Sequence, residues 1–298
     1  MVDKRIKLKS IIGLWFQVLF YSLLITALCF IFLPQTRTIK NLALAFLPVV
    51  GNSWWYISSY FALFFCIPIL NAAISQLSKK TYEKFLLVVL VGICIIECII
   101  PIDAFVFEGG YSAIWLIVLY LFGAYIKKYD LKDKITASKS ILGFLVMAVL
   151  TFLSKFVIYF ATEKILGQAK FHDIFVSYIS ITIVLASIFM FLFCLNIKIN
   201  GACQKIIAIF APTTLGVYLI HVHPLVFRFV IKNAFVSFTN KPVILMVALI
   251  LISVLAIFVL CAVIDLLRIQ LFKLVKVGKL SEAIDNKITS TYSCIFKG

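Results

Sequence analysis

Long apolar stretches recur along the whole chain, and short segments between them contain most of the charged residues. Eight stretches approach the length of about 20 residues with which a helix crosses a bilayer. They are residues 11–33, 54–74, 85–102, 111–126, 140–161, 174–196, 213–232 and 242–267. Backbone groups in lipid must pair within their own segment, so we expect helices. The pattern predicts an all-α, polytopic membrane helix bundle with about eight transmembrane helices, in a single domain over residues 1–298.

Composition agrees with the hydrophobic pattern. Hydrophobic residues make up 64% of the chain and charged residues only 13%. A soluble domain is roughly half apolar, so this excess cannot all be buried in one core. Two stretches depart from the ideal, because Glu97 interrupts the third and the fourth is short.

The positions of the basic residues predict the orientation. Twenty of the 28 Lys and Arg fall on one side if all eight spans are real. They are Lys4, Arg5, Lys7, Lys9, Lys79, Lys80, Lys84, Lys127, Lys128, Lys132, Lys134, Lys139, Lys198, Lys205, Arg268, Lys273, Lys276, Lys279, Lys287 and Lys297. Loops rich in Lys and Arg stay in the cytoplasm. We therefore expect both termini in the cytoplasm and a multi-pass protein of the cytoplasmic membrane.

The formal net charge of +16 has the same origin. A basic balance can indicate nucleic-acid binding, but here the charge lies in short loops beside spans, and no soluble domain presents a basic face. Residues 268–298 form a basic cytoplasmic tail. Its segment "RIQLFKLVKVGKL" either lies on the anionic inner leaflet or only fixes the topology.

The sequence contains no clear motif of a soluble catalytic domain. The eight cysteines lie mostly within apolar spans, without a CxxC pair or a Cys/His metal spacing. Neither a metal site nor a disulfide framework is predicted. The segment "EGGYS" has two glycines but lacks the GK[ST] of a phosphate-binding loop.

Polar residues are unusually concentrated in "TTLGVYLIHVHPLVFRFVIK", residues 213–232. In a continuous helix, Thr214, His221, Arg228 and Lys232 share one narrow face, with Tyr218 beside it. His223 points elsewhere, and Pro224 should kink the helix next to His221. Such a stripe faces the bundle interior or a water-filled cavity. The alternative is that His221 satisfies a buried carbonyl and Arg228 extends outward to the interface.

Two further charges lie within spans. The predicted topology places Glu97 and Lys155 in the outer halves of the third and fifth spans, at depths similar to those of His221 and Arg228. These four residues either line a cavity open to the outside, or Glu97 and Lys155 pair with each other.

Four segments carry a resemblance to a known family. In order, "GNSWWYISSYFALFFCIPILN" (51–71), "GGYSAIWLIVLYLFGAYIKKY" (109–129), "SYISITIVLASIFMFLF" (177–193) and "LGVYLIHVHPLV" (215–226) resemble the integral-membrane acyltransferase-3 family. The resemblance extends from about residue 5 to residue 270. It implies transfer of an acyl group, usually acetyl, from cytoplasmic acyl-CoA to a hydroxyl of a bacterial cell-surface or exopolysaccharide sugar. Acyl-CoA is then a donor substrate, and no bound cofactor is expected.

The chain also departs from the family pattern. Family members usually have ten spans, and the first carries a basic residue followed, after ten others, by a catalytic histidine. No histidine here has Arg or Lys eleven positions before it, and the first span resembles the family's third. We therefore expect two helices to belong before Met1. The family's principal catalytic histidine is not carried over onto any residue of this sequence.

The matched motifs name the candidate site. Trp54, Trp55 and Tyr60 match the family's "WF…Y" pattern, and Tyr218 and His221 match its "YLIH" pattern. The tryptophan pair could equally anchor a helix at the outer interface.

Acyl transfer to a hydroxyl needs a base and a donor to the oxyanion. We predict His221 and Arg228 as the catalytic residues. The predicted substrate-binding residues are Trp54, Trp55, Tyr60, Tyr218, Glu97 and Lys155. The sugar acceptor is expected to be a polysaccharide or a lipid-linked sugar.

Two other functions fit the same residues. A transporter or flippase for a lipid-linked or small acidic substrate would use the intramembrane charges as a pathway. An inactive remnant would only pack against a partner subunit.

Overall fold

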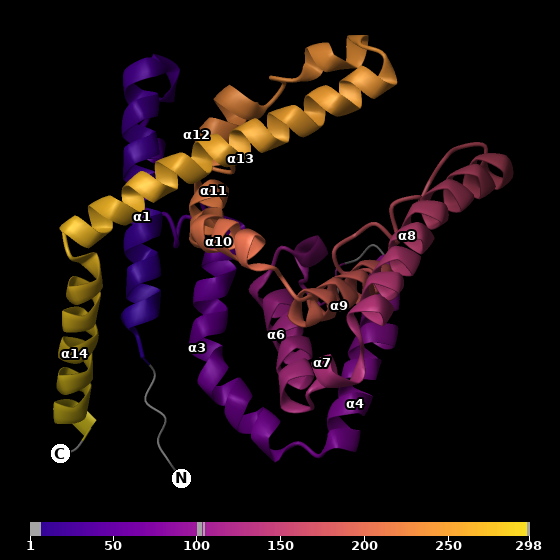
Figure 1. The fold of residues 1–298 in the computed structure, drawn as a ribbon, viewed down its shortest axis with the longest axis horizontal. Helices are drawn as coiled ribbons and strands as arrows, with labels where there is room; N and C mark the ends of the chain where they lie inside the picture. Colours follow the sequence, from indigo (N-terminus) through magenta and orange to yellow (C-terminus); the bar gives the residue numbers. More distant parts are fainter. Residues whose placement is uncertain (1–6, 100–102, 104, 297–298) are drawn as a thin grey trace. The chain divides into compact units, whose positions relative to one another are not determined.

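A computed structural model describes residues 7–99, 103 and 105–296, and over these residues the chain is helical without a strand. It divides into two compact units (Figure 1), Met1–Phe61 with Asn200–Gly298 and Ala62–Ile199. The first unit contains α1 (Lys9–Phe32), η1 (Pro34–Thr36), α2 (Ile39–Phe46), the start of α3 (Trp55–Gln76), α10 (Gly201–Phe210), η4 (Ala211–Thr213), α11 (Thr214–His221), α12 (Pro224–Val226), η5 (Phe227–Ile231), η6 (Val236–Asn240), α13 (Val243–Leu274) and α14 (Val277–Phe296). The second contains the rest of α3, α4 (Lys79–Leu87), η2 (Val88–Ile93), α5 (Cys94–Ile99), η3 (Glu108–Gly110), α6 (Ala113–Lys128), α7 (Leu131–Lys134), α8 (Ala137–Leu166) and α9 (Ile181–Asn196).

The prediction of an all-α membrane helix bundle is confirmed. Among the described residues, five helical segments are long and apolar enough to cross a membrane: α1, α3, α8, α13 and the continuous run Gly201–His221. The helix α9 is apolar but shorter. The predicted span 85–102 corresponds to the end of α4 with η2 and α5, and its residues 100–102 lie outside the described part of the chain.

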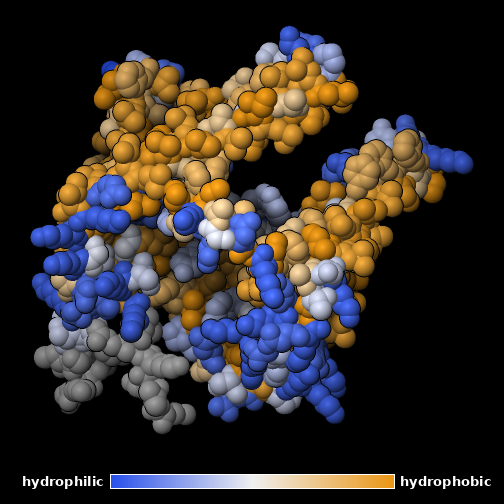
Figure 2. All heavy atoms as spheres, in the orientation of Figure 1, coloured by the Kyte–Doolittle hydropathy of each residue, from blue (hydrophilic) through white to orange (hydrophobic). Residues whose placement is uncertain are grey.

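The surfaces of α8 and α13 are apolar over most of their length. Large aliphatic side chains on α13 are widely exposed, including Ile244 and Leu251, and the same holds for Val157 on α8. Figure 2 shows this as hydrophobic colour along both helices. A soluble protein rarely exposes so much contiguous apolar surface, whereas a lipid-facing helix must.

Polar side chains fix where several helices begin. Ser78, Ser112, Thr136, Ser180 and Asn200 each accept a hydrogen bond from the backbone N–H three residues ahead. Short oxygen-bearing side chains at this position satisfy one of the unpaired N–H groups of the first turn. These side chains favour a helix N-terminus, and they therefore help to define the first residues of α4, α6, α8, α9 and α10.

The core of the first unit forms around α1. Val18, Tyr21 and Ile25 of this helix pack against Trp54, Ile57, Leu219 and Leu225. The helix α14 lies along the first turns of α1, where the Lys9 ammonium is 2.7 Å from the Glu282 carboxylate. The start of α1 and the helix α14 therefore lie side by side within this unit.

The core of the second unit joins α4, α6 and α9. Tyr82 is fully buried and donates a hydrogen bond of 2.7 Å to the Leu121 carbonyl. Trp115 and Phe122 of α6 share this core with Val184 of α9. Gly143 lets α8 approach α9 closely, because a Cβ there would lie 2.7 Å from the Phe189 ring.

Candidate functional site

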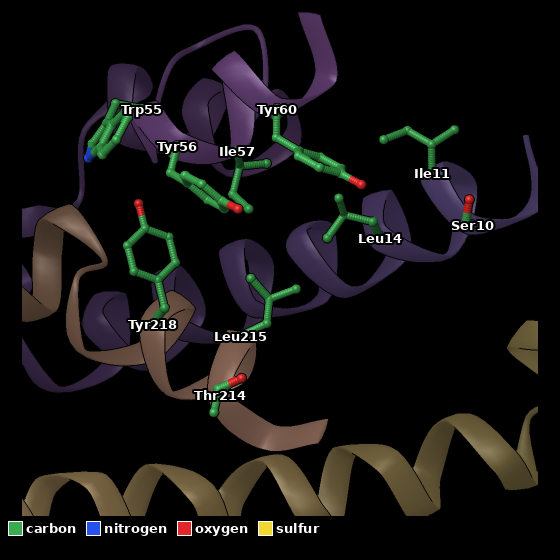
Figure 3. A pocket seen from close by; sticks show the side chains of 10 residues that line it. All are labelled: Ser10, Ile11, Leu14, Trp55, Tyr56, Ile57, Tyr60, Thr214, Leu215 and Tyr218. Carbon is green, nitrogen blue, oxygen red and sulfur yellow. The ribbon is translucent and has the colours of Figure 1, made fainter. Parts of the chain in front are cut away.

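An aromatic pocket of about 660 Å³ lies between α1, α3 and α11 in the first unit. Its lining residues, shown in Figure 3, are Ser10, Ile11, Leu14, Trp55, Tyr56, Ile57, Tyr60, Thr214, Leu215 and Tyr218. Most of the wall is apolar, with a few hydroxyl groups, which is the composition typical of small-molecule sites. Three of the predicted substrate-binding residues therefore come together here: Trp55, Tyr60 and Tyr218.

Three tyrosines form the polar part of this pocket. The rings of Tyr56 and Tyr60 stack with centroids 6.3 Å apart, one helical turn from each other. Tyr218 of α11 meets Tyr56 edge to face at 6.0 Å. The buried Tyr218 hydroxyl has no hydrogen-bond partner among the described residues. A buried hydroxyl without a partner is unfavourable, so a bound molecule that supplies one would be stabilised at this point.

His221 ends α11 one turn beyond Tyr218. Its ring is half-buried and lies edge to face with the Tyr218 ring, with centroids 6.5 Å apart. The His221 Nδ1 lies 2.6 Å from the Val217 carbonyl oxygen. Because a carbonyl only accepts, Nδ1 must carry the proton, and in the neutral ring Nε2 then has the free lone pair. This bond to a carbonyl is the one that the alternative interpretation of the sequence expected, and it leaves Nε2 able to accept a hydrogen bond.

His223 occupies a different environment. It is buried, its Nδ1 accepts a hydrogen bond of 3.2 Å from the Leu225 backbone N–H, and its ring meets the Trp54 ring at 5.1 Å. A cavity of about 30 Å³ beside it is lined partly by Ser22 and Thr26. This volume is enough for one water molecule. His223 caps the start of α12, so its role in the fold is structural.

The predicted polar stripe over residues 213–232 is wrong, because the helix is not continuous. The helix α11 ends at His221, His223 takes a non-helical conformation, and α12 restarts at Pro224. Residues Phe227–Ile231 then form a π-helix. The sequence predicts a kink at Pro224, and the structure instead shows a break, since proline suits the first position of a helix and not its interior. The spacing from His221 to Arg228 therefore does not put the two on one face.

Arg228 lies exposed on the π-helical segment. Its guanidinium carbon is 5.3 Å from the centroid of the Phe229 ring. The role of oxyanion donor stays a prediction for this residue.

Trp54 is a core residue rather than a membrane-interface anchor. Its side chain is 1% exposed and packs among α1 and α11 residues, whereas interfacial anchors keep one edge in the headgroup region. Trp55 is the member of the pair that lines the pocket. Residues 55–60 face Ser10 and Leu14, so the pocket lies by the first turns of α1 and next to its basic end.

In the second unit, Lys155 pairs with Asp173. The ammonium and carboxylate are 2.9 Å apart, and both side chains are widely exposed. The Lys155 hydrogen bond lowers the pKa of Asp173 below its ordinary value, and His172 lies on the other carboxylate oxygen at 3.3 Å. The side chain of Glu97 lies outside the described residues.

A buried charge network, which the sequence did not single out, links α1 and α13. Asp265 is fully buried and accepts a hydrogen bond of 2.6 Å from the Tyr21 hydroxyl. The guanidinium of Arg268 donates to both Asp265 oxygens, at 2.9 and 2.8 Å. The Asp265 carboxylate also abuts Gly216 of α11, where no side chain would fit. The sequence feature that could have indicated this network is an acidic residue inside an apolar span, three positions before an arginine.

A comparison with known protein families identifies the family of the whole chain. The profile of the acyltransferase-3 family, described as an acyltransferase domain, matches residues 6–264. The chain belongs to the acyltransferase-3 family. No curated protein and no solved structure gives a significant match.

Family membership makes the protein a membrane acyltransferase, and the match covers both compact units. An acyltransferase must hold an acyl donor and an acceptor with their reacting atoms together. In this acyltransferase, the first unit contains a pocket of suitable volume and a histidine next to its wall.

Proposed function

We propose that this membrane acyltransferase transfers an acyl group, namely acetyl, from acyl-CoA to a sugar hydroxyl. The acceptor is a cell-surface or exopolysaccharide sugar, reached as a polymer or on a lipid carrier, and the protein works in the cytoplasmic membrane. The reacting ends of both substrates occupy the aromatic pocket. Trp55, Tyr60 and Tyr218 contact them there, because aromatic faces pack against the C–H face of a sugar and phenol hydroxyls bond to its oxygens.

The reaction needs one proton transfer and one charge stabilisation. The sugar oxygen attacks the thioester carbonyl while a base takes the hydroxyl proton, and the carbon–sulfur bond then breaks. The departing sulfur leaves as a thiol with that proton. His221 is the proposed base, since its Nδ1 bond to Val217 leaves Nε2 to accept. Arg228 is proposed as the donor to the oxyanion for its charge alone, because the break at His223 removes the face that it was expected to share with His221.

A single observation carries the proposal: a histidine held in the accepting tautomer lies against a tyrosine of the aromatic pocket. Tyr218, whose buried hydroxyl is unpartnered, connects the two. We propose that a substrate group bonds to this hydroxyl and lies within reach of His221.

The test measures acyl transfer by the purified protein in lipid nanodiscs. Labelled acetyl-CoA and a lipid-linked glycan are supplied, and the labelled product is counted. His221→Ala should lower the rate about 10²–10⁴-fold, the usual contribution of a general base. Tyr218→Phe should lower it less, because only one hydrogen bond is lost.

A matched control is His172→Ala in the second unit, which should leave the rate unchanged. Full activity of folded His221→Ala would contradict the base assignment. The competing function gives a different result: a transporter would move substrate across vesicles without forming any acylated product.

A further inference from the structure

A second and larger cavity lies in the first unit, where the start of α1 meets the end of α13 and the start of α14. Its volume is about 870 Å³. Six cationic side chains line it, and one acidic side chain, Glu282, accompanies them. The cations are Lys7, Lys9, Arg268, Lys273, Lys276 and Lys279. In Figure 2, hydrophilic residues gather around this end of α13 and over α14.

Most of this charge is uncompensated within the protein. Lys9 is paired with Glu282 at 2.7 Å, and Arg268 is paired with Asp265. For Lys7, Lys273, Lys276 and Lys279, the described residues offer no carboxylate within ion-pair distance. Four like charges around one cavity repel one another, and water and salt screen that repulsion only in part. An anion of several charges would remove it.

The wall favours an anion with a flat or apolar part. The Phe272 ring lines the cavity, with the Arg268 guanidinium 5.1 Å from its centroid. The start of α14 lines the same cavity through Val277 and Gly278, and the first N–H groups of a helix have no partner within the helix. Lysines bind phosphate oxygens as point charges, whereas the Arg268 fork is already occupied by the Asp265 carboxylate.

The position of this cavity relates it to the aromatic pocket. Ser10 lines both, and Figure 3 shows it at one end of the aromatic pocket, on the first turns of α1. A long ligand could therefore place a charged end among the lysines and its other end among Tyr56, Tyr60 and Tyr218. Acyl-CoA has this form, with phosphates at one end and the thioester at the other.

We propose that this basic cavity binds the phosphate groups of a phosphorylated ligand, namely the nucleotide end of the acyl-CoA donor. This assignment rests on the proposed function. The same chemistry would accept the headgroup of an anionic phospholipid, so the experiment must separate these two sources.

The experiment measures binding of coenzyme A to the full chain in nanodiscs of zwitterionic lipid. The variant replaces Lys273, Lys276 and Lys279 with Gln. It should bind coenzyme A at least about tenfold more weakly, because each lysine contributes a fraction of that change. Coenzyme A without its 3′-phosphate should bind the wild type more weakly, and rising salt should weaken binding. The control removes equal charge from the second unit, at Lys80, Lys84 and Lys132, and should bind as the wild type does.

Four outcomes decide the question. Unchanged coenzyme A affinity in the Lys273/Lys276/Lys279 variant, with no loss of phosphatidylglycerol binding, overturns the site. Selective loss of phosphatidylglycerol binding, with coenzyme A unaffected, overturns the donor assignment and supports a lipid headgroup as the phosphate source. Loss of coenzyme A binding alone supports the donor assignment. If the variant loses coenzyme A binding but the wild type forms no acylated product, the site stands and the proposed function fails.

Discussion

Two ion pairs of similar composition behave differently in the two units. Asp265 and Arg268 lie in the first unit with the carboxylate fully buried and the guanidinium nearly so. Lys155 and Asp173 lie in the second with both side chains about half exposed or more. The distances are alike, at 2.8 and 2.9 Å, so geometry alone does not separate them.

The two pairs differ in the group that would remain if one partner were removed. Removing Lys155 leaves a carboxylate that its surroundings can solvate. Removing Asp265 leaves a buried guanidinium and a buried phenol without an acceptor, which is costly in a low-dielectric interior. The buried pair also joins α1 to α13 through Tyr21, whereas the exposed pair joins the α8 helix to the loop that follows it. Burial and the number of elements joined, rather than charge within a span, should therefore decide the structural weight of a pair.

The largest effect is expected for Asp265→Ala. It should lower the free energy of unfolding by about 3–5 kcal/mol, the usual cost of breaking a buried pair by removing one partner. The measurement is reversible unfolding in mixed detergent, with the exposed Asp133→Ala as control. A loss below about 1 kcal/mol would mean that solvent reaches the pair and that the comparison fails.

A smaller effect is expected for Gly216→Ala. Its new methyl group would collide with the Asp265 side chain, so α11 and α13 would have to move apart. Overpacking of this kind costs about 1–3 kcal/mol. Gly123→Ala is the control, because a Cβ there meets nothing within 4 Å and alanine favours the helix. Equal stability of both variants would show that α11 tolerates displacement from α13.

The sequence predicted a structural feature correctly where the pattern behind it extends over many residues or forms a recognisable motif. The long apolar runs predicted the helical membrane fold, because lipid leaves the backbone few alternatives. The motifs containing Trp55, Tyr60 and Tyr218 predicted residues that meet in one pocket. The stripe through Arg228 failed because periodicity assumes a continuous helix, and the break at His223 removes that assumption.

Other features depend on contacts between distant segments. The Tyr21–Asp265 bond joins residues 244 positions apart, which a local pattern cannot show. The burial of Trp54 likewise depends on how segment 33–53 returns along α1. The basic cavity combines lysines to which the sequence had assigned either a topological role or contact with the inner leaflet.

A third prediction concerns Lys155→Met in the second unit. Because this pair is exposed, the unfolding temperature should change much less than it does in Asp265→Ala. Asp173→Asn should give a similar value, and the double variant should differ little from either single variant. A loss in one single variant as large as that of Asp265→Ala would place the pair in lipid and remove its contrast with Asp265.

The smallest effect is expected in the pH dependence of the same pair. The Lys155 hydrogen bond lowers the pKa of folded Asp173 below its ordinary value of 3.8, so the folded state binds the proton less readily than the unfolded state does. The stabilisation is therefore fully present above the unfolded pKa and is lost as pH falls through the folded pKa. The unfolding temperatures of the wild type and Asp173→Asn should differ slightly near neutral pH and converge as the pH falls through the folded pKa of Asp173. In a Lys155→Met background the Asn substitution should give a smaller difference at neutral pH. A difference that instead grows on acidification would reverse the sign of the linkage and show that protonated Asp173 is the form that the fold prefers.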